Sequence, residues 1–187
     1  MKTAIVGNGV GGGYLYRLLK QRFPEDEIEV FGKKNGTSCL IRPCGWLINY
    51  PLFLKLGEEA NIDFDRYVMK RFNRMILQSK EIPSDVASID KPLLIQELFK
   101  GVKVKYSKPD ISQYDRVIDA TGKRVLLPKR DKSLLVKIKQ ARCEGSVREF
   151  PEGIVDNFHG LGYLIPLGNN TTHIGYGSIK DNNSKEI

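Results

Sequence analysis

The glycine-rich stretch near the N-terminus constrains the fold of this chain more than any other feature. An apolar run over residues 3–6 predicts a buried strand and leads directly into the pattern Gly7-x-Gly9-x-x-Gly12. Helical periodicity begins there, carried by apolar residues on one face: Leu15, Leu18, Leu19 and Phe23. Pro24 ends that helix, and a second apolar strand follows over residues 28–31. The stretch therefore predicts a strand–helix–strand unit of about 30 residues, the size of a dinucleotide-binding unit.

Each glycine of the pattern has a physical reason in a dinucleotide site. Gly7 permits a tight turn, Gly9 lets a diphosphate approach the backbone, and Gly12 lets the helix pack closely on the sheet. The free N–H groups and the dipole at the helix N-terminus attract the phosphate charge. A strand–helix turn without a ligand explains Gly12, but it gives no reason for five glycines within residues 7–13. We therefore predict a nucleotide site at this turn.

The position expected to bind the adenosine ribose departs from the dinucleotide pattern. It lies about 20 residues after the glycines, at the end of the second strand, and usually carries a carboxylate. Here that position is Gly32, while Glu29 lies inside the strand and is a poor substitute. Lys33 and Lys34 follow, which leaves two interpretations open. They face the 2′-phosphate of NADP, or they are solvated loop lysines.

Composition and charge narrow the function classes. The chain has 187 residues and a net charge of +8, which favours anionic ligands such as phosphates, or an anionic lipid surface. Its lysines are scattered and no nucleic-acid motif is present, so we predict no specific nucleic-acid partner. The three cysteines lack zinc spacing, and we find neither a signal peptide nor an apolar run of about 18 residues. These features predict a cytoplasmic protein.

Residues 36–50 read as an irregular loop. Their apolar residues and the sole tryptophan, Trp46, are unusual for a solvated loop, so another part of the molecule must cover them. Residues 52–57 predict a short helix. Together these segments line an apolar pocket, dip into a membrane interface, or pack as an ordinary core, and all three interpretations stay open.

The remaining sequence predicts a helix and several strands. Residues 67–78 fit either one helix or a strand pair, and Asp90 and Pro92 begin a helix that Gly101 ends. Strands are predicted over residues 102–106, 116–122 and 134–142, and a hairpin over 161–167 and 172–179.

The order of these elements predicts an α/β fold class. A Rossmann-like FAD/NAD(P)-binding βαβ half with a parallel sheet is followed by a smaller antiparallel β substrate half. We expect residues 1–50 and 85–130 in the dinucleotide-binding half, and residues 51–84 and 131–187 in the substrate half, as one compact unit. His159 and His173 carry no motif and are interpreted as surface or hairpin residues. Asp119, at the end of a buried strand, is expected to be hydrogen-bonded structure.

Four motifs follow one another along the chain. They are the glycine fingerprint over residues 7–12, Arg-Pro-Cys-Gly-Trp over 42–46, a strand ending in Ala-Thr-Gly over 115–122, and Gly-Tyr-Leu-Ile-Pro over 162–166 followed by Ile-Gly-Tyr-Gly over 174–177. In order and spacing they resemble the flavin-dependent geranylgeranyl reductases, within the wider class of FAD oxidoreductases similar to p-hydroxybenzoate hydroxylase.

This resemblance implies an FAD protein that reduces isolated double bonds in polyprenyl chains. It places Arg42 near the FAD, Cys44 near the isoalloxazine and the substrate, and residues 120–122 at the adenosine end. With the turn and the lysine already discussed, the predicted cofactor-binding residues are Gly7, Gly9, Val10, Gly11, Gly12, Gly13, Lys33, Arg42, Ala120, Thr121 and Gly122. Cys44 is the predicted catalytic residue, since a thiol beside the flavin can donate the proton that completes alkene reduction. The alternative for Cys44 is a small buried hydrophobe.

The chain departs from the family pattern in three places. Gly32 lacks the ribose carboxylate, Trp46 replaces a second glycine, and the segment that follows the hairpin in family members is absent. Three hypotheses therefore remain: an FAD oxidoreductase acting on a small-molecule or lipid-like substrate, an NADP-type binder, or a non-enzymatic chain. The last is a remnant or partner subunit that keeps the fold and needs a second chain for its missing third. A homo-oligomer and peripheral membrane contact are further alternatives.

Overall fold

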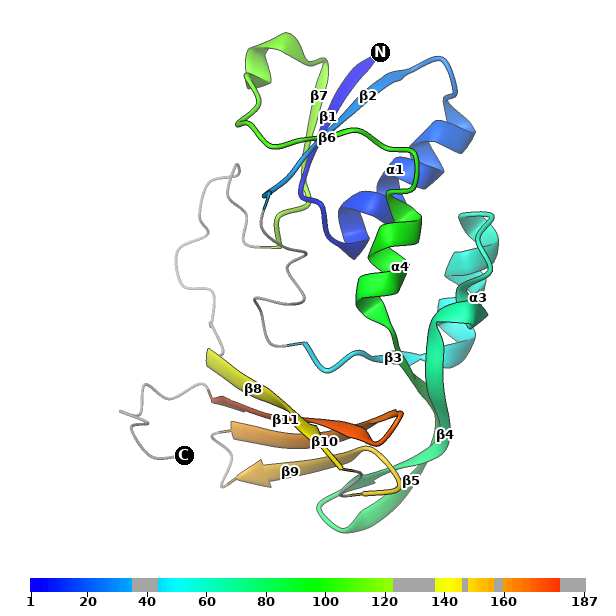
Figure 1. Cartoon of the computed structure of the whole chain (residues 1–187), viewed down its shortest axis with the longest axis vertical. Coiled ribbons are helices and arrows are strands. Elements are labelled where there is room, and N and C mark those ends of the chain that lie inside the picture. The colour runs from blue at the N-terminus through cyan, green and yellow to red at the C-terminus, as the bar shows by residue number, and fades with distance from the viewer. Residues whose placement is uncertain (35–43, 123–136, 146–147, 157–159, 179–187) are drawn as a thin grey trace. The chain divides into compact units, whose positions relative to one another are not determined.

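The computed structural model describes residues 1–34, 44–122, 137–145, 148–156 and 160–178 (Figure 1). The chain divides into two compact units, each built from three stretches of sequence. The first unit comprises Met1–Arg42, Lys55–Tyr67 and Asp90–Asp131, and the second comprises Pro43–Leu54, Val68–Ile89 and Lys132–Ile187. Each unit contains its own sheet.

The sheet of the first unit is parallel, with the strand order β6-β2-β1-β7. Its strands are β1 (Lys2–Val6), β2 (Glu27–Phe31), β6 (Val104–Lys105) and β7 (Arg116–Asp119). Helix α1 (Val10–Arg22) connects β1 to β2, which confirms the predicted strand–helix–strand unit. Because β2 and β7 flank β1 in parallel, the C-terminal ends of these three strands meet at one edge of the sheet.

Helix α1 packs on this sheet, and a second helix packs on α1. Ile5 and Val30 are fully buried in the strands, as is Leu98 of helix α4 (Lys91–Leu98). Asp90 caps α4, since its side chain accepts a hydrogen bond from Leu93 N at 3.0 Å, as the sequence predicted. Three further helical segments are described. Helix α3 (Tyr50–Glu59) confirms the helix predicted over residues 52–57, and the short 3-10 segments are η1 (Phe64–Tyr67) and η2 (Ile111–Gln113).

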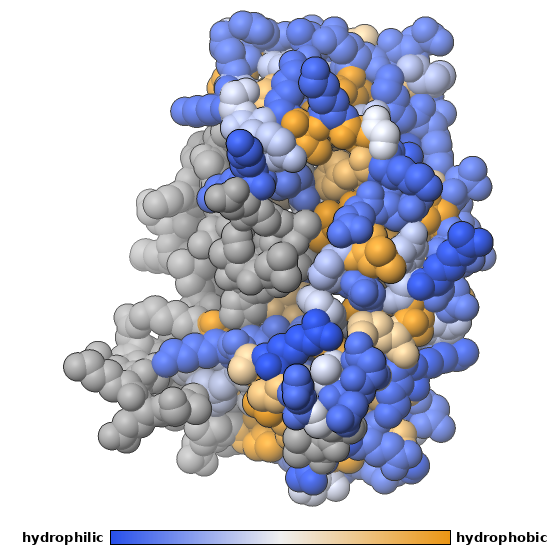
Figure 2. Space-filling view, in the orientation of Figure 1, coloured by the Kyte–Doolittle hydropathy of each residue, from blue (hydrophilic) through white to orange (hydrophobic). Residues whose placement is uncertain are grey.

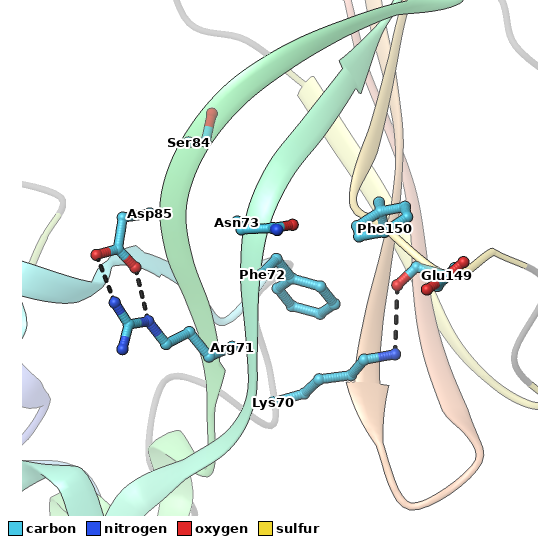
Figure 3. Close-up of a pocket in the computed structure, with 8 residues that line it drawn as sticks. All are labelled: Lys70, Arg71, Phe72, Asn73, Ser84, Asp85, Glu149 and Phe150. Carbon is cyan, nitrogen blue, oxygen red and sulfur yellow. Dashed lines mark hydrogen bonds and ion pairs between the residues drawn. The ribbon is translucent and has the colours of Figure 1, made fainter.

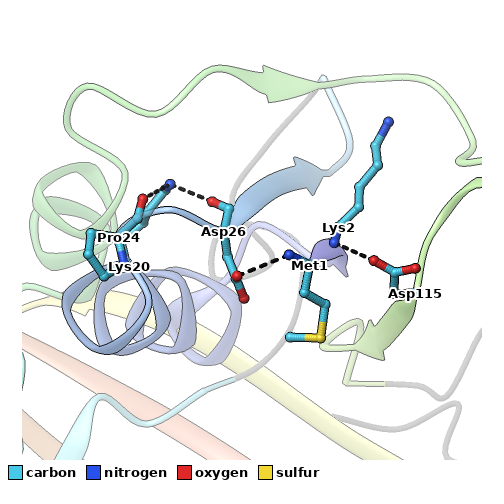
Figure 4. A network of polar contacts seen from close by, with 6 residues as sticks. All are labelled: Met1, Lys2, Lys20, Pro24, Asp26 and Asp115. Atoms are coloured by element: carbon cyan, nitrogen blue, oxygen red, sulfur yellow. Dashed lines mark hydrogen bonds and ion pairs between the residues drawn. The ribbon is translucent and has the colours of Figure 1, made fainter.

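A network of polar contacts fixes the first strand at its N-terminal end (Figure 4). The terminal amine of Met1 pairs with Asp26 at 3.1 Å, just before β2. Lys20 of α1 donates to the carbonyls of Pro24 and Asp26, and Lys2 N donates to Asp115 at 2.7 Å. The start of β1 is therefore tied to both neighbouring strands.

The second unit contains a seven-stranded sheet, with the order β3-β5-β4-β9-β10-β11-β8. Its pairings are antiparallel except that β4 and β9 run parallel. The strands are β3 (Leu47–Asn49), β4 (Val68–Leu77), β5 (Lys80–Ile89), β8 (Lys137–Glu144), β9 (Glu152–Asp156), β10 (Gly160–Gly168) and β11 (Thr171–Ser178). Together with the parallel sheet of the first unit, this sheet confirms the predicted α/β fold class.

Of the individual predictions for the second unit, some are confirmed and others were wrong. The hairpin of β10 and β11 is confirmed. The segment predicted as one helix or a strand pair forms the single strand β4 (Val68–Leu77), so neither alternative was right. The expectation of an irregular loop was wrong over Leu47–Asn49, because these residues pair with β5. Much of the remaining loop lies outside the described residues.

Among the described residues, no helix is long and apolar enough to cross a bilayer. Hydrophilic side chains cover most of the face in Figure 2, and apolar side chains lie among them in smaller patches. Large exposed apolar residues occur in both units, among them Tyr106 and Ile111 of the first and Ile154 and Leu161 of the second.

Candidate functional site

The turn between β1 and α1 is built so that only backbone fits within it. Gly7 has φ +134°, a conformation that side chains rarely adopt, and a Cβ there would overlap the carbonyl of Ala120. A Cβ on Gly12 would overlap the carbonyl of Gly7. Ala120 N donates to Val6 O at 2.8 Å, so the end of β7 is held against the turn. The structure therefore brings the glycine fingerprint and the Ala-Thr-Gly motif together.

The N-terminus of α1 carries no side-chain cap. Gly9 occupies the N-cap position without a side-chain hydrogen bond, and the first turn, which begins at Val10, has no acidic residue. Gly11 is exposed, and a Cβ there would meet nothing within 4 Å. The first intrahelical bond runs from Gly13 N to Gly9 O at 3.0 Å, so the N–H groups that precede Gly13 have no partner within the helix.

Gly13 lies on the packed side of α1. It is buried, and a Cβ there would approach Leu98 at 2.8 Å and the ring of Phe99 at 2.9 Å. Its small size therefore serves the packing of α1 against the end of α4. The other predicted glycines of the motif lie at the turn itself.

The residues after β7 form a compact polar turn. Asp119 accepts hydrogen bonds from Thr121 N at 3.0 Å and Thr121 Oγ1 at 2.6 Å, and Gly122 follows with φ +71°. This arrangement confirms that Asp119 is hydrogen-bonded structure. It also brings the Ala120 carbonyl beside Gly7, at the same sheet edge as the start of α1.

The end of β2 shows why no carboxylate is available to a ribose there. Glu29 is bound by Lys105 and by the hydroxyl of Tyr114, and these two hydrogen bonds, in that order, lower the pKa of its carboxyl. Burial, followed by the bond to Glu29, raises the pKa of Tyr114 to about 12. Gly32 lies at the sheet edge with Asn8 packed over it, and Lys33 and Lys34 are exposed.

These features fit a diphosphate. A phosphate group needs backbone N–H donors, room for close approach and no competing negative charge. The turn offers the uncapped amides of α1, open space beside Gly11, and a first helical turn without acidic residues. The chain thus carries in one unit the parts that a dinucleotide cofactor requires at its phosphates.

The predicted catalytic cysteine belongs to the second unit. Cys44 is a half-buried cysteine. The following residue, Gly45, lies against Ile165 of β10, which a Cβ on Gly45 would approach at 2.5 Å. Trp46 is 7% exposed with φ +61°, and its indole Nε1 has no hydrogen-bond partner within the described part of the chain. Arg42 and Cys39 lie outside the described residues.

A tyrosine and a glycine pair across the β10–β11 hairpin next to Cys44. Tyr163 stands opposite Gly175, where a Cβ would overlap the phenol ring, and its hydroxyl donates to Gln140 Oε1 at 2.6 Å. Burial, and secondarily the neighbouring Cys44, raise the pKa of Tyr163. The Gly-Tyr and Gly-Tyr-Gly motifs therefore have a structural reason, because each aromatic ring needs a glycine across the ladder.

His173 is a hairpin residue, as expected, but it is buried rather than on the surface. It is 3% exposed, its Nδ1 lies 3.3 Å from the carbonyl of Gly45, and its ring meets Trp46 edge-on at 4.7 Å between centroids. Burial lowers the pKa of His173, and the charge of Arg142 lowers it further, against the opposing effect of the Gly45 carbonyl. His173 and Trp46 therefore hold the Cys44 segment to the sheet. His159 lies outside the described residues.

Sequence reasoning missed a hollow on the β4–β5 hairpin, with a volume of about 530 Å³ (Figure 3). Arg71 forms a two-bond ion pair with Asp85, both at 2.8 Å, and Lys70 donates to the carbonyl of Glu149 at 3.3 Å. Phe72 and Phe150 also line it. Because its basic groups are engaged with neighbouring oxygens, the hollow offers an anion little. Within the described part of the chain, no group of His, Cys, Asp and Glu could hold a metal ion.

No family model matches this sequence, and neither does any curated protein. Solved structures do match its fold. A geranylgeranyl bacteriochlorophyll reductase-like protein from Thermoplasma acidophilum is 15% identical with a TM-score of 0.67, over 95% of this chain and 56% of its own. HpxO of Klebsiella pneumoniae, solved with FAD and uric acid, is 13% identical with a TM-score of 0.68, over 100% and 58%.

A tryptophan 6-halogenase from Streptomyces toxytricini matches with a TM-score of 0.72 at 14% identity, over 98% of this chain and 57% of its own. The chain therefore spans less than two thirds of the length of these structures. At such identities the likeness establishes the fold alone. Other solved structures with this fold include a probable FAD-dependent monooxygenase from Pseudomonas aeruginosa. Because a geranylgeranyl bacteriochlorophyll reductase-like protein also shares it, the resemblance drawn from the sequence motifs is confirmed at the level of the fold.

Proposed function

We propose that this chain binds FAD and acts as an oxidoreductase that reduces carbon–carbon double bonds of a prenyl-type apolar substrate. The observation that carries the proposal is the β1–α1 turn. There Gly7 and Gly12 leave room for backbone only, and α1 has no side-chain cap. The fold shared with HpxO, which was solved with FAD, and with a geranylgeranyl reductase-like protein supports it.

The proposed roles follow from what each residue offers. The amides at the start of α1 bind the diphosphate, while the close packing of Gly7 against Ala120 fixes the turn that presents them. FAD supplies hydride chemistry when it is bound. Of the two carbons of the double bond, one receives the hydride and the other receives a proton from the thiol of Cys44. Water then reprotonates the thiolate. Tyr163, hydrogen-bonded to Gln140, fixes the neighbourhood of that thiol.

The absorbance spectrum of the purified chain tests the cofactor. We expect a yellow preparation with flavin bands, or a chain that quenches flavin fluorescence when FAD is added. Reduction of a prenyl alcohol by the dithionite-reduced complex, followed by mass spectrometry as a gain of two hydrogens, tests the reaction. Cys44→Ser is expected to lower that rate more than tenfold, since a general acid contributes about 10²–10⁴ in rate, while FAD affinity stays unchanged.

A second candidate is an NADP-type binder. The observation that favours it is the pair of exposed lysines after Gly32, which lacks a carboxylate that would repel a 2′-phosphate. In this case NADPH binds more tightly than NADH, and Lys33→Ala removes the difference. A chain that binds neither FAD nor NADPH would overturn both proposals and favour the non-enzymatic alternative.

A further inference from the structure

The side chain of Asn8 lies over the end of β2, in the space that a side chain at position 32 would enter. A Cβ on Gly32 would overlap Asn8 Cγ and lie 2.7 Å from its Cβ. The carboxamide of Asn8 also forms two hydrogen bonds with the backbone of Lys33, the residue after Gly32. Nδ2 donates to Lys33 O at 3.3 Å, and Oδ1 accepts from Lys33 N at 3.5 Å. Asn8 and Gly32 are therefore a matched pair, because Asn8 can lie there only while residue 32 is glycine.

This position is the one where a dinucleotide fold places the group that binds the adenosine ribose. A carboxylate accepts hydrogen bonds from ribose hydroxyls, and a carboxamide oxygen can accept one in the same way. The two bonds from Asn8 to Lys33 are long, and a carboxamide oxygen has a second lone pair, so acceptor capacity remains at Oδ1. The carboxylate on the same strand, Glu29, is already bound by Lys105 and Tyr114.

We propose that Asn8 binds the 2′-hydroxyl of the nucleotide's adenosine ribose through Oδ1, in place of the carboxylate that position 32 lacks. The inference rests on the proposed nucleotide site at the β1–α1 turn and names a specificity-determining residue within it. A glycine at position 32 is then a requirement of the site and not the loss of a ligand.

Calorimetric titration of the full chain with ADP and with 2′-deoxy-ADP tests this directly. A net hydrogen bond is worth about fivefold in affinity, so wild type should bind ADP about fivefold more tightly than 2′-deoxy-ADP. Asn8→Ala should bring that ratio to one, while leaving the affinity for 2′-deoxy-ADP unchanged. Asn73→Ala, which removes an exposed carboxamide in the second unit, should keep the wild-type ratio.

Two further variants separate ribose binding from a merely structural role. Gly32→Ala displaces Asn8 and should lower the ratio, whereas the double variant Asn8→Gly/Gly32→Asp puts a carboxylate in the vacated space and should restore it. An unchanged ratio in Asn8→Ala would overturn the inference while nucleotide binding itself stands. Failure of wild type to bind ADP at all would overturn both the inference and the proposed function.

Discussion

Gly11 is the residue at which the proposed phosphate site can be changed without disturbing the fold. It is exposed on the first turn of α1, and a side chain there meets open space. An acidic residue in the first turn of a helix interacts favourably with the helix dipole, by about 0.3–1 kcal/mol. The same charge repels a diphosphate bound at that helix end. Stability and ligand binding should therefore respond in opposite directions.

We predict that Gly11→Asp raises the free energy of unfolding of the chain without ligand, and weakens FAD binding at least tenfold. Gly11→Asn, which has the same shape without the charge, should weaken FAD binding much less. Urea unfolding and quenching of flavin fluorescence measure the two effects. Equal FAD affinities for the two variants would show that no phosphate lies near the start of α1.

His173 gives a pH dependence whose sign follows from its burial. Burial holds the pKa of His173 below the ordinary value of 6.5, and the charge of Arg142 lowers the pKa further. The unfolded chain therefore takes up the proton first as the pH falls below about 6.5. The neutral imidazole of His173 therefore makes its full contribution to the free energy of unfolding above about pH 6.5. That contribution is lost as the pH falls through the lower pKa of the folded state.

We predict that His173→Gln loses less stability than wild type between pH 7.5 and 5. Urea unfolding followed by tryptophan fluorescence reports on this part of the second unit, since Trp46 is the only tryptophan and lies against His173. Carboxyl groups titrate in both proteins, so the difference between the two curves isolates the imidazole. Parallel curves would rule out a contribution from His173.

At the scale of elements, Arg17 joins helices α1 and α4 of the first unit. Its guanidinium donates to the carbonyls of Glu97, Leu98 and Lys100 at 2.7–2.8 Å, where α4 ends. Carbonyls at a helix C-terminus lack partners within the helix and carry partial negative charge, so a cation bound there stabilises the helix end. α4 packs against α1, whose N-terminus forms the proposed phosphate site.

We predict that Arg17→Met lowers the free energy of unfolding by about 1.5–3 kcal/mol, the range for hydrogen bonds to a charged group. Arg22→Met, at the exposed end of the same helix, should change it by less than about 0.5 kcal/mol. Thermal and urea unfolding of both variants provide the comparison. Equal losses would mean that the three carbonyl contacts contribute no net stability.

Elements with clear periodicity were the ones that the sequence allowed us to predict. β1, α1, β2 and the β10–β11 hairpin have recurrent apolar residues and are bounded by turn residues. β5 was missed because it contains Pro83, which argues against a strand, and because its first half is polar and exposed. In the structure Pro83 lies beside a shift in register between β4 and β5, where the ladder can accommodate it.

In the candidate site, too, features set by neighbouring residues could be predicted, whereas features set by contacts between distant residues could not. The turn at Gly7 follows from local rules for strand–helix connections. The packing of the Asn8 side chain over Gly32 joins residues 24 positions apart, and it depends on the path of the chain after β2. The burial of His173 likewise comes from its pairing with the Cys44 segment, because nothing in the hairpin pattern distinguishes an inward polar residue from an outward one.

At the scale of the whole molecule, the division into two units makes the effect of a ligand local. The fingerprint turn, residues 120–122 and α4 all belong to the first unit, whereas Cys44, Tyr163 and the β4–β5 hollow belong to the second. A ligand that binds only the folded state stabilises it by about 2.7 kcal/mol at a concentration of 100 times Kd. A nucleotide bound at the β1–α1 turn should therefore stabilise the first unit, which contains that turn.

Hydrogen exchange measured by mass spectrometry, with and without ADP, maps where the stabilisation appears. We predict slower exchange over residues 7–13 and 120–122, because amides that bind phosphate or support the turn open less often. ADP carries the diphosphate and the ribose but no flavin ring, so β4 (Val68–Leu77) should exchange at its ligand-free rate. If ADP instead protected β4 and left residues 7–13 unchanged, the hollow lined by Lys70 and Arg71 would be the anion site, and the β1–α1 turn would be no more than a glycine-rich connection.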